Sequence, residues 1–193
     1  KGAQVGSFGD YACFSLHAQK NITTLGEGGV LVVKDNEIAS LVPGLRHNGH
    51  ASYGERAHYW KPAMGNVDLD MDGVWPFNYS MNEVQAALGT ELLGRLDLLN
   101  TERRARAVKF ISEMRDYPEL VFQKTEDKAQ NSYHLLPARY DGTNKCNDDL
   151  IELLSNEYKI KTIVQYYPLN KYPLFKKMGF GEADCPETDI FFD

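Results

Sequence analysis

One lysine stands in a segment whose residue types could support amine chemistry. Lys20 lies in the polar turn of residues 20–27, between two short apolar runs, residues 11–16 and 28–33. A lysine in a protein pocket can be neutral, because burial or a neighbouring cation lowers its pKa, and a neutral amine can form a Schiff base with an aldehyde. Pyridoxal phosphate is the cofactor built on that bond. Lys20 is therefore the first candidate for a chemical role.

The phosphate of such a cofactor needs hydrogen-bond donors near the lysine. Ser15, just before the turn, offers a hydroxyl group, and the Gly28-Gly29 pair lets two backbones approach closely where the turn re-enters a sheet. Simpler interpretations stay open at this point. A single lysine in a turn is most often a solvated surface residue, and Ser15 could be an ordinary strand residue.

The elements that must hold this turn follow from the hydrophobic pattern. The apolar runs 11–16 and 28–33 predict two buried strands, and residues 36–42 predict a short helix that ends before Pro43. Residues 45–76 show little periodicity and are rich in Gly, His, Tyr, Trp and Asp. They predict a long loop that grips a substrate or forms an interface patch.

The strongest helical pattern covers residues 81–115, where leucines recur at three-to-four spacing. Asn78 or Ser80 is expected to cap this helix, and Gly89 and Gly94 are candidate bends. The leucine stripe predicts core packing rather than a ligand site.

The rest of the chain predicts a change of subdomain. The polar residues 125–131 are followed by a strand at 133–140, a helix at 148–158 and a strand at 160–166. Alternating strands and helices indicate an α/β or α+β architecture.

Composition excludes several classes of protein. The 193 residues carry 21 Lys and Arg against 27 Asp and Glu, a net charge of −6, and the positive charges are scattered. A nucleic-acid binder would need a basic stripe, so we expect no nucleic-acid partner. No run approaches the length of a membrane span, so we expect no membrane partner.

The cysteines and histidines indicate neither disulfides nor a metal site. The cysteines are three, widely spaced and outside any CxxC arrangement, which favours reduced thiols and a cytoplasmic setting. His47 and His50 lack the further ligands that zinc requires. Residues 68–72 begin like a calcium loop, but no Glu stands at the closing position. We therefore predict no metal.

The segments around Lys20 resemble a known family. The run GSFGDYACFSLHAQKNITTLGEGGVLVV resembles the pattern G-S-x-G-D-x-x-x-F-S-F-H-x-x-K-N-x-T-x-G-E-G-G of the DegT/DnrJ/EryC1/StrS sugar aminotransferases, which are pyridoxal-phosphate enzymes. LRHNGH and FNYSMNEVQAALGTELLGRLD look like further segments of that family. NSYHLLPARY and IKTIVQYYPL are similar to its weaker patterns.

The resemblance implies the aspartate-aminotransferase-like α/β fold, fold type I of the pyridoxal-phosphate enzymes. Residues 1–100 would be the C-terminal part of the cofactor-binding large domain, and residues 101–193 a small α/β domain truncated at its end. Family members are longer chains that carry, upstream of the lysine, an Asp that pairs with the pyridine nitrogen. The resemblance therefore implies a fragment truncated at both ends, which alone is incomplete as an enzyme.

The resemblance also implies roles for individual residues. Lys20 would be the Schiff-base lysine and proton shuttle, Ser15 would bind the cofactor phosphate, and Asn78 would reach a phosphate across a homodimer interface. His17 would line the acceptor pocket or act as an acid–base helper, and a structural, hydrogen-bonded histidine is the equal alternative.

The implied activity is transfer of an amino group from L-glutamate to a keto or aldehyde sugar. Ser80 stands where the family commonly has an Arg, and Asn170 where a His often follows Pro-Leu. The lost Arg would remove a bidentate phosphate partner, which favours a free sugar acid over a nucleotide-linked sugar. The alternatives are a sugar dehydratase of the same family, in which a His typically replaces the lysine, and a non-catalytic regulatory homologue.

Overall fold

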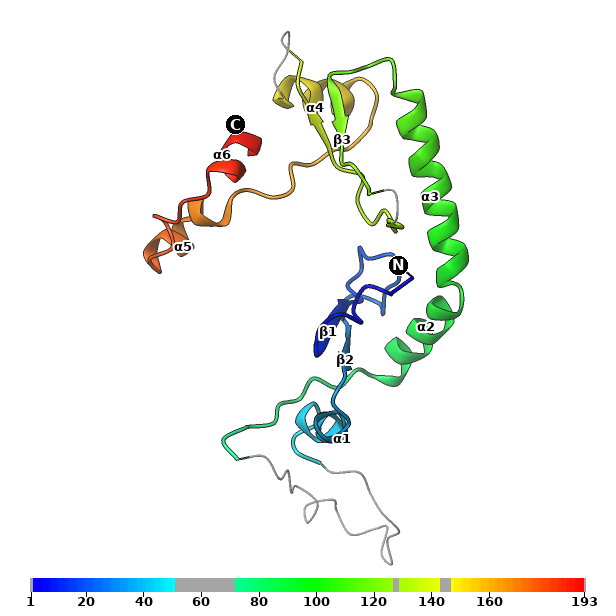
Figure 1. Cartoon of the computed structure of the whole chain (residues 1–193), viewed down its shortest axis with the longest axis vertical. Helices are drawn as coiled ribbons and strands as arrows, with labels where there is room; N and C mark the ends of the chain where they lie inside the picture. Colours follow the sequence, from blue (N-terminus) through cyan, green and yellow to red (C-terminus); the bar gives the residue numbers. More distant parts are fainter. Residues whose placement is uncertain (1, 51–71, 127–128, 143–146, 193) are drawn as a thin grey trace, which may run out of the picture. The chain divides into compact units, whose positions relative to one another are not determined.

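A computed structural model describes residues 2–50, 72–126, 129–142 and 147–192 of the chain (Figure 1). It divides into two compact units, one formed by Lys1–Asp116 and Phe122–Pro137, the other by Tyr117–Val121 and Ala138–Asp193. The predicted long loop at 45–76 and the acidic residues of 68–72 lie largely outside the described residues. No helix in the described ranges is long and apolar enough to cross a membrane.

The first unit is built on an antiparallel hairpin of β1 (Tyr11–Ser15) and β2 (Gly29–Val33). Tyr11 pairs with Val33 and Ser15 with Gly29. Backbone bonds continue past the strand ends, because Leu16 N–H donates to Gly28 O at 2.8 Å. The two strands are therefore confirmed, and they hold the lysine-bearing turn between them.

Helix α1 (Asn36–Leu45) follows the hairpin and begins at a capping aspartate. The Asp35 carboxylate accepts hydrogen bonds from the backbone N–H groups of Glu37 and Ile38 at 2.8 and 3.0 Å. The predicted end before Pro43 is wrong, because Pro43 lies inside the helix. Proline removes only its own N–H donor, and the last turn still closes through Arg46 N–H to Val42 O at 3.0 Å.

The single helix predicted over residues 81–115 is two helices, α2 (Glu83–Gly94) and α3 (Leu96–Glu113). Arg95 separates them with φ −103° and ψ 2°, directly after Gly94, and Figure 1 shows the bend. Glycine at a helix end lowers the cost of leaving helical geometry, so the break falls at one of the two expected positions.

The predicted cap of this region is also wrong. The cap is Asn82 rather than Asn78 or Ser80, and it forms a capping box with Gln85. Gln85 N–H donates to Asn82 Oδ1 at 2.9 Å, and Asn82 N–H donates to Gln85 Oε1 at 3.2 Å. This reciprocal pair satisfies two N–H groups that the helix itself leaves unpaired.

The second unit contains a small sheet and short helices. Strand β3 (Leu120–Phe122) pairs with β4 (Ala138–Tyr140), and the helices are α4 (Asn147–Asn156), the 3-10 turn η2 (Leu169–Lys171), α5 (Pro173–Lys177) and α6 (Pro186–Phe192). The predicted strand at 133–140 is shortened to its last three residues. The predicted strand at 160–166 is absent from the described part, where neither β3 nor β4 has a third strand beside it.

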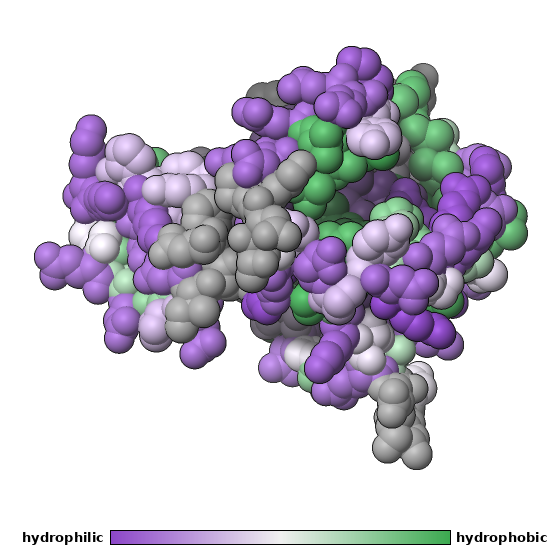
Figure 2. Space-filling view, turned by 90° about the horizontal axis from the view of Figure 1, so that it is seen from above, coloured by the Kyte–Doolittle hydropathy of each residue, from purple (hydrophilic) through white to green (hydrophobic). Residues whose placement is uncertain are grey.

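Few side chains of the described residues are buried. Leu16 and Ala107 are the buried hydrophobic residues, and Thr24 is fully buried. The prediction of buried strands is wrong for this chain on its own, since Tyr11 is 56% exposed and Val30 47%. Hydrophobic side chains at the surface are visible in Figure 2. A two-stranded sheet has two faces and no second layer here to cover them.

Helix α3 runs through the predicted domain boundary between residues 100 and 101 without a break. The division into a large-domain part and a small domain stays a prediction.

Candidate active site

Lys20 lies on the turn that closes the β1–β2 hairpin. The turn is held from within by backbone bonds from Lys20 N–H to His17 O at 2.9 Å and from Ala18 N–H to Gly26 O at 2.7 Å. The Lys20 side chain is half-buried, and its amine makes no hydrogen bond or ion pair with any described residue. The amine therefore has no competing partner in the described part of the chain.

Thr24 fixes the turn against the start of β2 and against α2. It is 0% exposed, and its hydroxyl donates to Glu27 O at 3.2 Å. A Cβ on Gly28 would overlap the Thr24 hydroxyl, and a Cβ on Gly89 of α2 would lie 2.9 Å from Thr24 Cγ2. The turn therefore fits closely because glycine occupies both positions. The predicted close backbone approach lies at Gly29, where a Cβ would be 3.2 Å from the backbone oxygen of Phe14.

Two amide side chains tie the turn to other elements of the first unit. Asn21 Nδ2 donates to Asn100 Oδ1 on α3 at 3.2 Å and to the backbone oxygen of Ser132 at 3.1 Å. Gln85 Nε2 on α2 donates to Glu27 O at 3.1 Å. The two Asn21 bonds connect the residue next to Lys20 with positions 79 and 111 residues further along the chain.

His134 lies near Lys20 on the segment that contains Ser132. Burial, and then the positive charges of Lys20 and Arg103, hold the pKa of His134 below its ordinary value of 6.5. Its Nδ1 is buried and has no hydrogen-bond partner among the described residues. Burial and the two nearby cations thus both favour the neutral form of the ring.

An unusual backbone conformation precedes His134. Tyr133 has φ 46°, in the left-handed region that a bulky residue seldom adopts. The Asn131 side chain stabilises this bend by accepting a hydrogen bond from Tyr133 N–H at 2.8 Å. Strained residues of this kind are concentrated at functional sites, where the surrounding structure holds them in place.

Ser15 and His17 lie at the start of the same turn. Ser15 Oγ accepts from His17 N–H at 3.3 Å, which leaves its own O–H free to donate. His17 Nδ1 accepts from Gln19 N–H at 3.2 Å, and its Nε2 lies 3.6 Å from Glu27 Oε1. These local contacts suit a structural histidine, and the predicted role of His17 in substrate binding stays a prediction.

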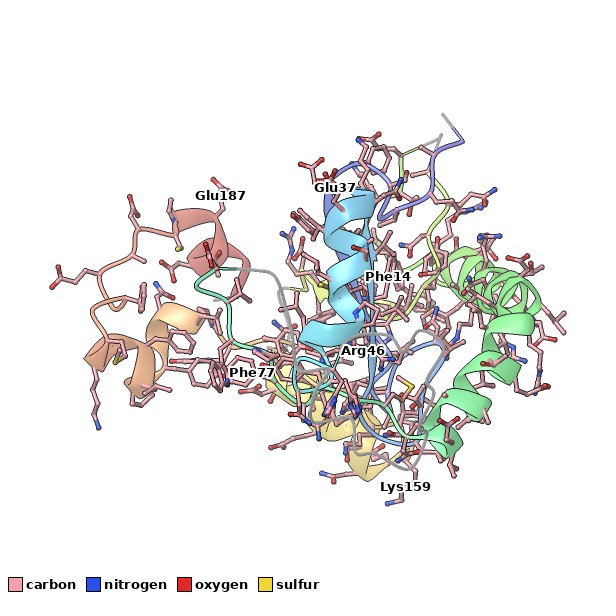
Figure 3. All side chains as sticks on the ribbon, turned by 90° about the horizontal axis from the view of Figure 1, so that it is seen from below. Phe14, Glu37, Arg46, Phe77, Lys159 and Glu187 are labelled. Atoms are coloured by element: carbon pink, nitrogen blue, oxygen red, sulfur yellow. The ribbon has the colours of Figure 1, made fainter. Side chains whose placement is uncertain are left out.

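Asn78 belongs to a different part of the first unit. It forms an antiparallel bridge with His47 just after α1, flanked by bonds from Phe77 N–H to Leu45 O and from Tyr79 N–H to Arg46 O at 3.0 and 2.8 Å. Arg46 and Phe77, one residue from each of these two segments, are labelled in Figure 3. Its Oδ1 accepts from Ser80 N–H at 3.2 Å. No hydrogen bond joins Asn78 to Ser15 or Lys20 among the described residues.

Ser80, at the position of the missing arginine, also has a defined partner. Its Oγ lies 2.8 Å from His47 Nδ1. Asn170, at the position of the missing histidine, belongs to the second unit and donates from Nδ2 to Ala183 O at 3.1 Å. Both side chains thus have partners within the chain.

The described residues fit a phosphorylated aldehyde better than a metal. No group of three or more His, Cys, Asp and Glu in the described ranges could hold a metal ion. The amine of Lys20 has no partner among the described residues, and Ser15, whose O–H is free to donate, ends the strand that precedes the turn. This donor set matches a ligand with an aldehyde and an anionic group.

Comparison with known proteins assigns the family. The model of the DegT/DnrJ/EryC1/StrS aminotransferase family matches residues 1–193. The chain belongs to this family. The resemblance predicted from the motifs around Lys20 is therefore confirmed.

Individual members of the DegT/DnrJ/EryC1/StrS family show how much of the fold is present. The chain is 31% identical over 195 residues to the spore coat polysaccharide biosynthesis protein SpsC of Bacillus subtilis, covering 100% of this chain and 49% of SpsC. It is 31% identical over 196 residues to the UDP-4-amino-4,6-dideoxy-N-acetyl-beta-L-altrosamine transaminase of Campylobacter jejuni, covering 100% of this chain and 47% of the transaminase. The chain thus spans about half the length of the curated relatives it matches.

A solved structure supports the fold. Spr1654 of Streptococcus pneumoniae in its PMP form superposes with a TM-score of 0.81 at 25% identity, covering 100% of this chain and 48% of Spr1654. Spr1654 has also been solved in a PLP form. The coarse prediction of a pyridoxal-phosphate transferase fold is confirmed, and the finer domain description stays a prediction.

Several residues around the turn of this DegT/DnrJ/EryC1/StrS chain are not predicted from the sequence. Asn21, Asn100 and Ser132 hold the turn, and Arg103 and His134 lie near Lys20. The segment NSYHLLPARY did stand out as a family pattern, but it carried no assigned role. Contacts across 79 and 111 positions leave no periodic signal, so local patterns could not connect these residues with Lys20.

Proposed function

We propose that the protein is a pyridoxal-phosphate-dependent aminotransferase that moves an amino group from L-glutamate to a keto or aldehyde sugar. The observation that carries this proposal is the unpaired, half-buried amine of Lys20 on a closely packed turn. Family membership, the transaminase relative and the PLP and PMP forms of Spr1654 support it.

Lys20, Ser15 and Asn78 would hold the cofactor. Lys20 Nζ would bond covalently to the cofactor aldehyde, and the Ser15 hydroxyl would donate to its phosphate. Asn78 would donate to the phosphate of the neighbouring subunit's cofactor, so the active enzyme is a homodimer with a shared site. Asn78 bridges to His47, whereas the lysine turn bonds to α3, and these separate contacts suit two residues that serve the cofactors of different subunits.

Pyridoxal phosphate, when bound, withdraws electrons from the carbon that carries the amino group and so makes its proton labile. Lys20 Nζ, once released by the incoming amine, would accept this proton and return it at the neighbouring carbon. The bonds of Asn21 and Thr24 would keep the lysine within reach during both half-reactions. His17 would line the acceptor pocket.

The location that we propose is the cytoplasm. Cys13 and Cys185 are free thiols in the described part of the chain, and disulfides are rare in that compartment.

The test is an absorption spectrum of the full-length protein with pyridoxal phosphate, before and after addition of L-glutamate. We expect a visible band of lysine-bound cofactor that disappears when glutamate is added, with a new near-ultraviolet band. A band that glutamate leaves unchanged would favour a dehydratase, another amino donor or a regulator. A missing band would contradict the cofactor assignment.

A further inference from the structure

Three elements of the first unit bring cationic and polar side chains together beside Lys20. The lysine turn contributes Lys20 and Asn21, α3 contributes Asn100 and Arg103, and the segment 131–134 contributes Ser132 and His134. Asn21 joins all three, because its amide donates to Asn100 Oδ1 and to Ser132 O. Residues three apart on a helix share a face, so Arg103 lies on the same side of α3 as Asn100.

Lys20 and Arg103 give this cluster positive charge, and none of its residues carries a carboxylate. Neither Lys20 nor Arg103 makes an ion pair within the described ranges, and Arg103 is half-buried. The nearby acids are engaged elsewhere. Glu27 on the turn lies 3.6 Å from His17, and Glu102 on α3 pairs with Arg106 at 3.3 Å.

The same region contains buried polar atoms that have no partner. Nδ1 of His134 and Oδ1 of Asn21 are both buried without a hydrogen bond among the described residues. Buried polar atoms in proteins almost always have partners, and unpartnered ones need an explanation. The left-handed Tyr133 that directs the chain into His134 is a further sign of a built site.

We propose that Arg103, His134 and the turn of Lys20 form a binding site for an oxyanion group, a carboxylate or a phosphate, of a substrate. The inference rests on the proposed aminotransferase function and adds the residues that recognise its charged substrate. Arg103 supplies the charge and a planar set of donors. The lowered pKa of His134 favours its neutral ring, which keeps one N–H that donates to the oxyanion.

Two small molecules carry the two possible oxyanions. Glutarate has the carboxylates of the amino donor without its amino group, so it binds without reacting. UDP carries the diphosphate of a nucleotide-linked sugar. Binding of each is measured by calorimetry on the full-length protein loaded with pyridoxal phosphate, in the wild type and in Arg103→Gln.

We expect Arg103→Gln to weaken the binding of at least one probe by about tenfold to a hundredfold, the usual effect of losing a hydrogen bond to a charged group. Loss with glutarate assigns the site to the donor carboxylate, and loss with UDP assigns it to the sugar phosphate. Arg106→Gln is the matched control, because Arg106 lies on the same helix, is 80% exposed and pairs with Glu102. It should leave both affinities unchanged.

Arg103→Lys is the control for a folding defect, because it keeps the positive charge. It should bind the probe more tightly than Arg103→Gln, and the thermal midpoints of the two variants should be equal. A readout independent of affinity is the pKa of His134, followed by NMR of labelled histidine. An oxyanion beside the ring favours its charged form, so the binding probe should raise this pKa.

Equal affinities in wild type and Arg103→Gln, or no binding of either probe to the wild type, would overturn the site. The visible cofactor band is recorded on the same samples. A normal band together with unchanged affinities rejects this site alone, whereas a missing band rejects the aminotransferase.

Discussion

Lys20 is the single residue on which the proposed chemistry depends, because its amine is half-buried and unpaired. We expect Lys20→Ala in the full-length protein to abolish the visible cofactor band and to lower turnover by at least about a thousandfold, since it removes both the covalent anchor and the proton carrier. Lys109→Ala is the control, because Lys109 is 75% exposed and pairs with Glu113 on the surface of α3. Full turnover in Lys20→Ala would show that the lysine has another role.

His134 makes the stability of the protein depend on pH. Its folded pKa lies below the ordinary 6.5, so the unfolded chain takes up a proton first as the pH falls. The free energy of unfolding should therefore decrease as the pH falls from 6.5 to the lowered folded pKa. Above pH 6.5 the contribution of neutral His134 to stability is fully present.

His134→Gln should remove this pH-dependent contribution to the free energy of unfolding. The measurement is urea unfolding at a series of pH values between 5 and 8, with the wild type and His134→Gln side by side. Identical pH profiles for the two proteins would mean that His134 does not titrate differently in the folded state.

Some of these residues could be predicted from the sequence and others could not. Lys20 and Ser15 stand in a contiguous run, so their types and spacing are visible along the chain. The positions of Asn21 and His134 in the site depend on the hydrogen bond from Asn21 to Ser132, 111 positions away, and on the left-handed backbone of Tyr133. Neither the long-range contact nor the left-handed φ is encoded in a local pattern.

At the scale of elements, the packing of the lysine turn on α2 depends on the absence of one side chain. A Cβ on Gly89 would lie 2.9 Å from Thr24 Cγ2, whereas a Cβ on Gly94 of the same helix would meet nothing within 4 Å. Gly94→Ala should change the free energy of unfolding by no more than about 0.5 kcal/mol, because Gly94 is the last residue of α2 and its Cβ would be in open space.

Gly89→Ala gains helix propensity in the interior of α2 but overpacks the contact with Thr24, so we expect the free energy of unfolding to fall by about 1–3 kcal/mol. Urea unfolding of both variants provides the comparison. The cofactor band should also weaken in Gly89→Ala only, because the turn that carries Lys20 must shift. Equal free energies of unfolding for the two variants would mean that the turn is not packed closely on α2.

The element boundaries show which local signals are reliable. The capping box of Asn82 and Gln85 follows an N-x-x-Q spacing that is visible in the sequence. The helical periodicity from residue 81 instead favours a cap at Asn78 or Ser80, two to four positions too early. The strand expected at 160–166 has the right residue types, but it lacks a neighbouring strand in the described part. Residue type alone does not supply a partner.

At the scale of the whole molecule, the proposed shared site predicts complementation between defective subunits. A mixture of Lys20→Ala and Asn78→Ala subunits forms hybrid dimers in which one site has both an intact Lys20 and an intact Asn78. If half of the dimers are hybrids, mixing should restore about a quarter of the wild-type activity at limiting cofactor.

The mixture is compared with each variant alone after the same dissociation and reassociation. Activity no greater than the average of the two variants would contradict a site shared between subunits. Circular dichroism of each variant confirms that a loss of activity does not come from unfolding.

The hairpin that carries Lys20 has one further consequence, for handling the protein. Tyr11, Phe14 and Val30 are 56%, 40% and 47% exposed, and both strands of this two-stranded sheet have an open edge. Open strand edges and apolar faces are templates for pairing with other chains. This 193-residue chain, produced alone, should therefore self-associate with a concentration dependence visible by light scattering. Added charge on the solvent-facing edge of β2, as in Val32→Lys, should slow that aggregation without touching the lysine turn.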